Sequence, residues 1–154
     1  MAKKLNMAIV KENIKKLSEK KKIEFDDGVH VNIYPDFAMS KVSELLKEVL
    51  TDELKANEAG IDFSSVNRGD WLMFNIIKKF SDLVIPGDIK KKIQAFIYLR
   101  DSDYFLKLVN EYPEESLKKV QVGIDSANNL LKEMKNLNAN QINSIVDKLI
   151  PDEK

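Results

Sequence analysis

The spacing of the apolar residues changes near the start of the chain, and this change constrains the fold more than any other feature. Between about residues 22 and 34 hydrophobic and polar residues alternate, whereas from residue 40 onward apolar residues recur every three or four positions. Alternation is typical of a half-buried strand, and the longer spacing is typical of an amphipathic helix. The sequence therefore predicts an α+β fold that is predominantly α-helical, with a small β-hairpin at about 22–34 followed by a multi-helix bundle.

The turn of this hairpin contains Asp26, Asp27 and Gly28. A two-residue Asp27–Gly28 loop would place the apolar residues of the two strands on opposite faces of the hairpin. A three-residue loop pairs Phe25 with Val29 and gathers the apolar residues on one face. We therefore expect the three-residue loop, with Gly28 supplying the positive φ that it requires.

The helical spacing predicts a series of helices separated by Gly, Pro and Asp residues. Ser40 is expected to cap the helix that ends at Gly60, and Asp88 is expected to cap a later one. Residues 61–67 are predicted to form a polar connector, and Asp101–Asp103 to interrupt a helix. The predicted helices lie at about 8–20, 40–57, 72–80, 89–100, 104–112, 114–136 and 142–149.

The charges divide the chain into two parts. Residues 1–22 contain eight Lys and two Glu, a net charge of +6, and the remainder of the neutral chain carries −6. We expect a Lys-rich arm over residues 1–21 and a single hairpin-plus-helical domain over residues 22–150. The arm is a candidate for binding nucleic acid or an acidic partner, through Lys15, Lys16, Lys20, Lys21 and Lys22. Because it lacks Arg and aromatic residues, a solubilising helix, or an arm folded onto the acidic body, is the favoured interpretation.

The longest predicted helix, 114–136, carries apolar residues at alternating intervals of three and four. This spacing forms a seam of the kind seen in coiled coils. Two interpretations follow: an ordinary core helix, or a helix–helix interface with a partner or a second copy. The seam consists of Leu117, Val120, Ile124, Ala127, Leu131 and Met134.

The residue patterns of catalytic, metal and cofactor sites do not occur in the sequence. There is no Cys, and the single His30 is expected to pair with Glu24 on the exposed face of the hairpin. Asp101–Asp103 starts like a calcium loop but continues with aromatic residues, and Lys90–Lys92 is expected to be a solvated helix face. We therefore predict no catalytic residue, metal ligand or cofactor, and hence no enzyme activity. The absence of Cys and of a 20-residue apolar run predicts a cytoplasmic protein that does not enter a membrane.

Several short segments between about residues 22 and 110 follow one another in a distinctive order. They are Tyr34-Pro35-x-Phe37, Met39-Ser40-Lys41-Val42, Glu44-Leu45-Leu46-Lys47-Glu48, Trp71-Leu72-Met73-Phe74, Ile76-Ile77-Lys78-Lys79-Phe80-Ser81-Asp82-Leu83, Ile85-Pro86, Ile93-x-x-Phe96 and Asp103-Tyr104-Phe105. This order resembles that of tail-assembly chaperones and neighbouring tail-morphogenesis proteins of Gram-positive siphophages and prophages. The resemblance implies a non-enzymatic factor that binds a helical client such as the tape-measure protein, or other tail proteins, in the bacterial host cytoplasm and that can form a homo-oligomer. The Lys-rich arm and the long 114–136 helix depart from the family pattern, and a nucleic-acid-binding or regulatory protein is the alternative.

Overall fold

A computed structural model of the chain describes residues 3–64 and 66–134, and it confirms the predominantly helical α+β fold. Within α6 the side chains of residues 127–128 and 130–134 fall outside this description, as do residues 142–149, where a last helix was predicted. The described elements are α1 Met7–Asn13, the 3-10 helix η1 Ile14–Ser18, β1 Lys21–Glu24, β2 His30–Ile33, α2 Met39–Glu58, α3 Arg68–Lys79, α4 Ile89–Asp101, α5 Tyr104–Glu111 and α6 Glu114–Met134.

The hairpin has the register that its apolar pattern predicted. Ile23 pairs with Val31 across the two antiparallel strands, and the Phe25 N–H donates to the Val29 carbonyl at 2.8 Å. The loop therefore contains three residues, and Gly28 has the expected positive φ of 84°. Ile23 and Val31 are buried on the face turned toward the helices, whereas the Glu24–His30 pair is exposed on the other side.

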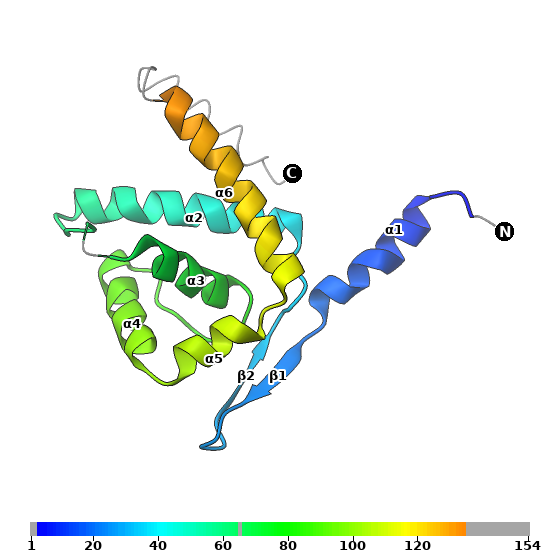
Figure 1. The fold of residues 1–154 in the computed structure, drawn as a ribbon, viewed down its shortest axis with the longest axis horizontal. Coiled ribbons are helices and arrows are strands. Elements are labelled where there is room, and N and C mark those ends of the chain that lie inside the picture. Colours follow the sequence, from blue (N-terminus) through cyan, green and yellow to red (C-terminus); the bar gives the residue numbers. More distant parts are fainter. Residues whose placement is uncertain (1–2, 65, 135–154) are drawn as a thin grey trace.

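The helices pack into one body beside the hairpin, with α3, α4 and α5 below α2 and with α6 crossing α2 (Figure 1). Aromatic rings fill the space between α3 and α4. The Trp71 ring lies 5.1 Å from Phe96 and 5.4 Å from Phe74, measured between ring centroids. A second aromatic group, formed by Phe37, Phe80 and Tyr112, joins the start of α2 to the ends of α3 and α5.

The helix boundaries agree with the predicted capping residues in two of three cases. Asp88 caps α4, since its carboxylate accepts a hydrogen bond from the Lys91 N–H, and Gly60 ends α2 with a φ of 72°. Ser40 is not a cap, because α2 already begins at Met39 and its N-cap, Ala38, offers no side-chain hydrogen bond. The first turn is closed by backbone hydrogen bonds alone, from the Lys41 and Val42 N–H groups to the Ala38 carbonyl.

Substitution of Gly60 by Ala should lower the free energy of unfolding by about 1–2 kcal/mol, because an L-residue is strained at positive φ. A Cβ at Gly60 would meet no atom within 4 Å, so the effect reports backbone strain alone. Gly87→Ala is the matched control, since its Cβ also enters open space and its φ is not positive. Urea unfolding of both variants tests this, and equal stabilities would contradict it.

The crossing of α2 and α6 is close because α6 has a glycine there. A Cβ added to Gly123 would lie 2.5 Å from the Leu46 Cδ1 atom of α2. The distance between two packed helices depends on the side chains at their contact. A larger residue at position 123 would have to displace the flexible Leu46 side chain.

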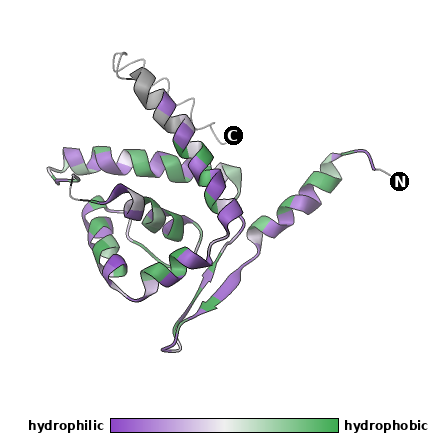
Figure 2. Cartoon of the chain, viewed as in Figure 1, coloured by the Kyte–Doolittle hydropathy of each residue, from purple (hydrophilic) through white to green (hydrophobic). Residues whose placement is uncertain are grey.

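The predicted N-terminal helix is present but does not join the core. It runs as α1 and then tightens into η1, and neither element has a buried residue. It extends away from the helical body (Figure 1) and carries both hydrophobic and hydrophilic residues (Figure 2). Of the two alternatives to nucleic-acid binding, the structure does not show the arm folded onto its own body.

Candidate protein-binding groove

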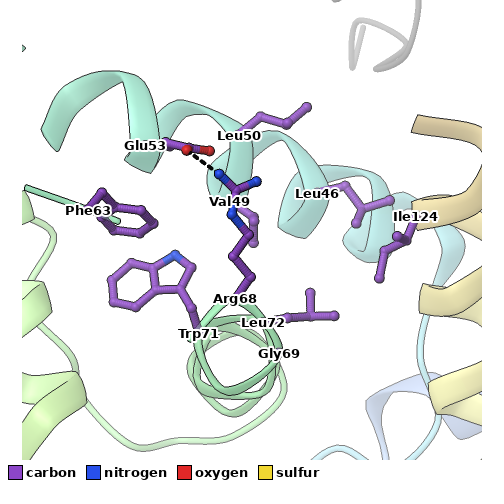
Figure 3. Close-up of a pocket in the computed structure, with 10 residues that line it drawn as sticks. All are labelled: Leu46, Val49, Leu50, Glu53, Phe63, Arg68, Gly69, Trp71, Leu72 and Ile124. Carbon is purple, nitrogen blue, oxygen red and sulfur yellow. Dashed lines mark hydrogen bonds and ion pairs between the residues drawn. The ribbon is translucent and has the colours of Figure 1, made fainter. Parts of the chain in front are cut away.

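An apolar groove lies between α2, α3 and α6, with a volume of about 350 Å³. Trp71 and Leu72 of α3 form its base, Leu46 and Val49 of α2 form one wall, and Ile124 of α6 closes one end (Figure 3). Grooves of this size with mostly apolar walls are typical binding sites. The remaining lining residues are Leu50, Glu53, Phe63, Arg68 and Gly69.

The opposite end of the groove is built by the connector between α2 and α3. The sequence predicted this segment to be polar, but Phe63 is buried and packs edge-on against Trp71, with ring centroids 5.2 Å apart. The indole nitrogen of Trp71 faces α2 (Figure 3), and among the described residues this buried N–H has no hydrogen-bond partner. The base of the groove is thus aromatic and carries an unused hydrogen-bond donor.

One ion pair spans the groove. The Arg68 guanidinium donates to the Glu53 carboxylate at 2.6 Å, joining α3 to α2 (Figure 3). The Arg68 side chain is 79% exposed, so the pair is screened by solvent and holds the two helices only weakly. It gives the groove a polar rim that a partner can rearrange. Arg68–Asp70 forms the first turn of α3.

The predicted helix–helix seam of α6 is divided between the core and this groove. Val120 is buried in the core, and Leu117 packs against the core while half-buried. Ile124 packs against the core and also lines the groove. Ala127, Leu131 and Met134 lie outside the described side chains. The first half of the seam therefore contacts this chain's own α2, in agreement with the core-helix interpretation for those residues.

Beneath the groove, α2 presents a stripe of acidic residues to lysines of α3 and α4. The Lys92 Nζ atom lies 2.6 Å from the Asp52 Oδ2 atom and 3.6 Å from the Glu48 Oε1 atom. Lys78 also contacts Glu48, at 2.6 Å. Lys92 is only 1% exposed and Asp52 only 3%. The prediction that Lys90–Lys92 is a solvated face was therefore wrong for Lys92, which the helix period directs into the core.

Burial and charge act in opposite directions on these groups. Burial raises the pKa of Asp52 and lowers the pKa of Lys92, although their mutual contact opposes both shifts. Burial also tends to raise the pKa of Glu48, but the hydrogen bond from Lys78 and the charges of Lys92, Lys78 and Lys79 leave it below its ordinary value. The cluster is a charged network inside a helical core, where each charge depends on its partner.

The lysines predicted as a basic arm do not form one surface. Lys15 pairs with Glu12 at 2.7 Å, Lys21 with Glu111 at 3.2 Å and Lys22 with Glu24 at 3.0 Å. Lys20 lies over the ring of Tyr34, with its Nζ atom 5.9 Å from the centroid, and Lys16 is exposed on η1. Pairing reduces the charge that they could offer to phosphates, so nucleic-acid binding remains a prediction without support from their arrangement.

The described residues, 3–64 and 66–134, contain no cluster of three His, Asp or Glu side chains placed to hold a metal ion. Within the same ranges no helix combines the length and the apolar composition that crossing a membrane requires. His30 and Glu24 are exposed strand partners, as predicted.

The fold and the groove define the class: a small, mostly helical α+β protein with an apolar groove between three helices. The model of the YomO family matches residues 7–154, and the chain belongs to this family. A relative is the SPbeta prophage-derived uncharacterized protein YomO of Bacillus subtilis (strain 168), which is 37% identical over 145 residues, covering 94% of this chain and 87% of the relative. No solved structure matches the chain.

These comparisons confirm the bacteriophage or prophage part of the resemblance, and they do not extend to tail assembly. The family match begins at residue 7 and so includes α1. Most of the Lys-rich arm therefore lies within the span that the YomO family shares.

The sequence did not single out the groove, because its residues come from segments up to 78 positions apart, from Leu46 to Ile124. One signal was available. The apolar stripe of α2 includes both Leu45–Leu46 and Val49–Leu50, which is wider than one neighbouring helix covers. A stripe of this width indicates either two neighbours or an open apolar edge.

Proposed function

We propose that this protein is a non-enzymatic phage protein that binds a helical segment of another protein in its groove, as a tail-assembly chaperone does. Three observations support the proposal: the family kinship with a prophage-derived protein, the resemblance of residues 22–110 to tail-assembly chaperones, and the groove itself. The client would be the tape-measure protein, a long helical protein whose apolar surface must be shielded until the tail tube encloses it. The chaperone would act in the host cytoplasm.

The groove carries this proposal because its chemistry suits an amphipathic helix. Such a helix presents apolar anchors at positions i, i+3 or i+4 and i+7, and these insert into an apolar groove between helices. Trp71, Leu72 and Val49 offer the apolar surface, and the Glu53–Arg68 pair offers one charge of each sign to the polar flank of the client. A client helix with charged residues of both signs on its polar flank would form ion pairs with Glu53 and Arg68 in place of the pair between these two residues.

Co-expression with the tape-measure protein of the same phage genome tests the proposal. We expect the native chain to raise the soluble fraction of the tape-measure protein and to co-purify with it. Leu72→Asp and Leu50→Asp should each abolish co-purification, because each places a charge among apolar groove walls. Leu54→Asp is the matched control, since Leu54 lies one turn after Leu50 on α2, is 61% exposed and does not line the groove.

Circular dichroism of all three variants separates loss of binding from loss of the fold. A groove variant that keeps its helix content and still solubilises the tape-measure protein would remove the groove from the mechanism. A native chain that leaves the tape-measure protein insoluble would contradict the chaperone role itself.

A further inference from the structure

The N-terminal arm, defined here as α1 and η1, has an apolar stripe, and no residue of this stripe is buried by the described part of the chain. Met7, Val10, Ile14 and Leu17 follow at intervals of three and four, so they lie along one side of the arm. Met7 is 66% exposed and Ile14 is 50% exposed. An amphipathic helix that buries no residue gains nothing from packing, and so short a helix is barely stable alone in water. The arm would therefore be more stable if another surface buried this stripe.

A receiving surface for an apolar stripe is present on α4. The chain between α3 and α4 and the outer side of α4 enclose an apolar hollow of about 320 Å³, which we name the α4 hollow. Val84 at its edge is 92% exposed, and Tyr98 is 73% exposed. Leu83, Ile85 and Leu99 complete its apolar walls. Large apolar side chains grouped in this way on a protein surface mark an interaction site.

An acidic hollow adjoins the α4 hollow. It lies between the hairpin loop and the turn from α4 to α5, has a volume of about 380 Å³, and is lined by Asp26, Asp27 and Asp103. The two hollows share Ser102 and Tyr104, so one surface offers apolar and acidic halves side by side. The one lysine of the acidic hollow, Lys107, is already engaged, since its Nζ atom donates to the Glu24 carbonyl at 2.8 Å.

An apolar hollow beside an acidic hollow suits a cationic amphipathic helix, and the N-terminal arm is such a helix. Residues 3–20, which contain the arm, carry a net charge of +4, whereas residues 21–134 carry −4, so the arm of one copy and the body of another attract each other. We propose that the arm of one copy lies on the α4 surface of a second copy, with its apolar stripe in the α4 hollow and its lysines toward the acidic hollow. Reciprocal exchange of two arms gives a closed, two-fold symmetric dimer.

A nucleic acid is the less suitable occupant of this surface, because phosphates would be repelled by Asp26, Asp27 and Asp103. The groove between α2, α3 and α6 shares no lining residue with either hollow. Arm exchange is therefore independent of client binding, and either proposal can fail without the other.

Light scattering on a sizing column, over a wide range of protein concentration, tests the exchange. We expect the native chain to reach the mass of a dimer, and Ile14→Asp or Val84→Asp to raise the dimer dissociation constant by about tenfold or more, because each puts a charge in place of a buried apolar contact. Ile9→Asp is the matched control, because Ile9 lies off the stripe, about 120° around the helix from its middle, and is 38% exposed. A native chain that stays monomeric at every concentration, or an Ile9→Asp change as large as that of Ile14→Asp, would overturn the proposal.

Cysteine trapping decides whether the arm docks on a second copy or folds back on its own body. The chain contains no Cys, so two single variants, Ile14→Cys and Val84→Cys, can be mixed and oxidised without competing thiols. We expect a disulfide between the two variants, seen on a non-reducing gel as a product of twice the mass that forms in the mixture and not when either variant is oxidised alone. The double variant in one chain should likewise give linked dimers. If it gives a monomer with an internal disulfide, the arm docks in cis and the dimer proposal is wrong.

Discussion

Replacing Lys92 by Met should lower the free energy of unfolding by about 3–5 kcal/mol, since it leaves the Asp52 carboxylate buried without its partner. The two groups are 2.6 Å apart and almost fully buried. Lys91→Met is the matched control on the same helix, and a change within about 0.5 kcal/mol is expected there, because Lys91 is exposed. Urea unfolding of both variants measures the difference, and equal stabilities would contradict the role of the buried pair.

The double variant Lys92→Met/Asp52→Leu should recover most of this loss, because it removes both charges and keeps the volume filled. The loss in Lys92→Met should also depend on pH. Burial raises the pKa of Asp52 above its ordinary value of 3.8, and this effect is stronger once Lys92 is absent. A carboxyl group with a raised folded-state pKa stabilises the fold below its unfolded pKa and loses that contribution as pH rises. The deficit of Lys92→Met should therefore be small near pH 4 and grow toward pH 7.

Replacing Phe37 by Ala should cost about 3–5 kcal/mol, through lost burial and the cavity that remains. The Phe37 ring is fully buried and stacks on Phe80 with a centroid distance of 3.8 Å, and Tyr112 meets it edge-on at 5.6 Å. Since small domains have a total stability of about 5–15 kcal/mol, this single change removes a large part of it.

Leu106→Ala is the control for this prediction, because Leu106 is 72% exposed and its removal opens no cavity. Thermal unfolding of the two variants should show a clear decrease in Tm for Phe37→Ala and almost none for Leu106→Ala. A similar Tm for both would mean that the second aromatic group contributes little to the core.

The hairpin and most helices could be predicted because local pattern decides them. The register of Ile23 with Val31 follows from the period of two, and the end of α2 follows from a glycine that accepts positive φ. The start of α2 could not be predicted in this way, because no side chain caps it. These elements are therefore specified locally, apart from a helix end that no capping side chain marks.

The groove and the buried charges depend on which helices meet, and the sequence does not state this. Lys92 stands among two other lysines, and only its position on α4 relative to Asp52 of α2 makes it a core residue. Glu48 and Asp52 fall one turn apart on α2, beside its apolar stripe. An acidic pair at the border of an apolar stripe was a usable signal of partners within the core.

The close crossing at Gly123 connects the groove to α6. Leu46 lines the groove and also lies against Gly123 of α6. An occupant that displaces Leu46 would therefore change the contact between α2 and α6. Residues 124–134 continue the helix for about 16 Å beyond that point. A change in the contact between Leu46 and Gly123 therefore also bears on the position of the C-terminal half of α6.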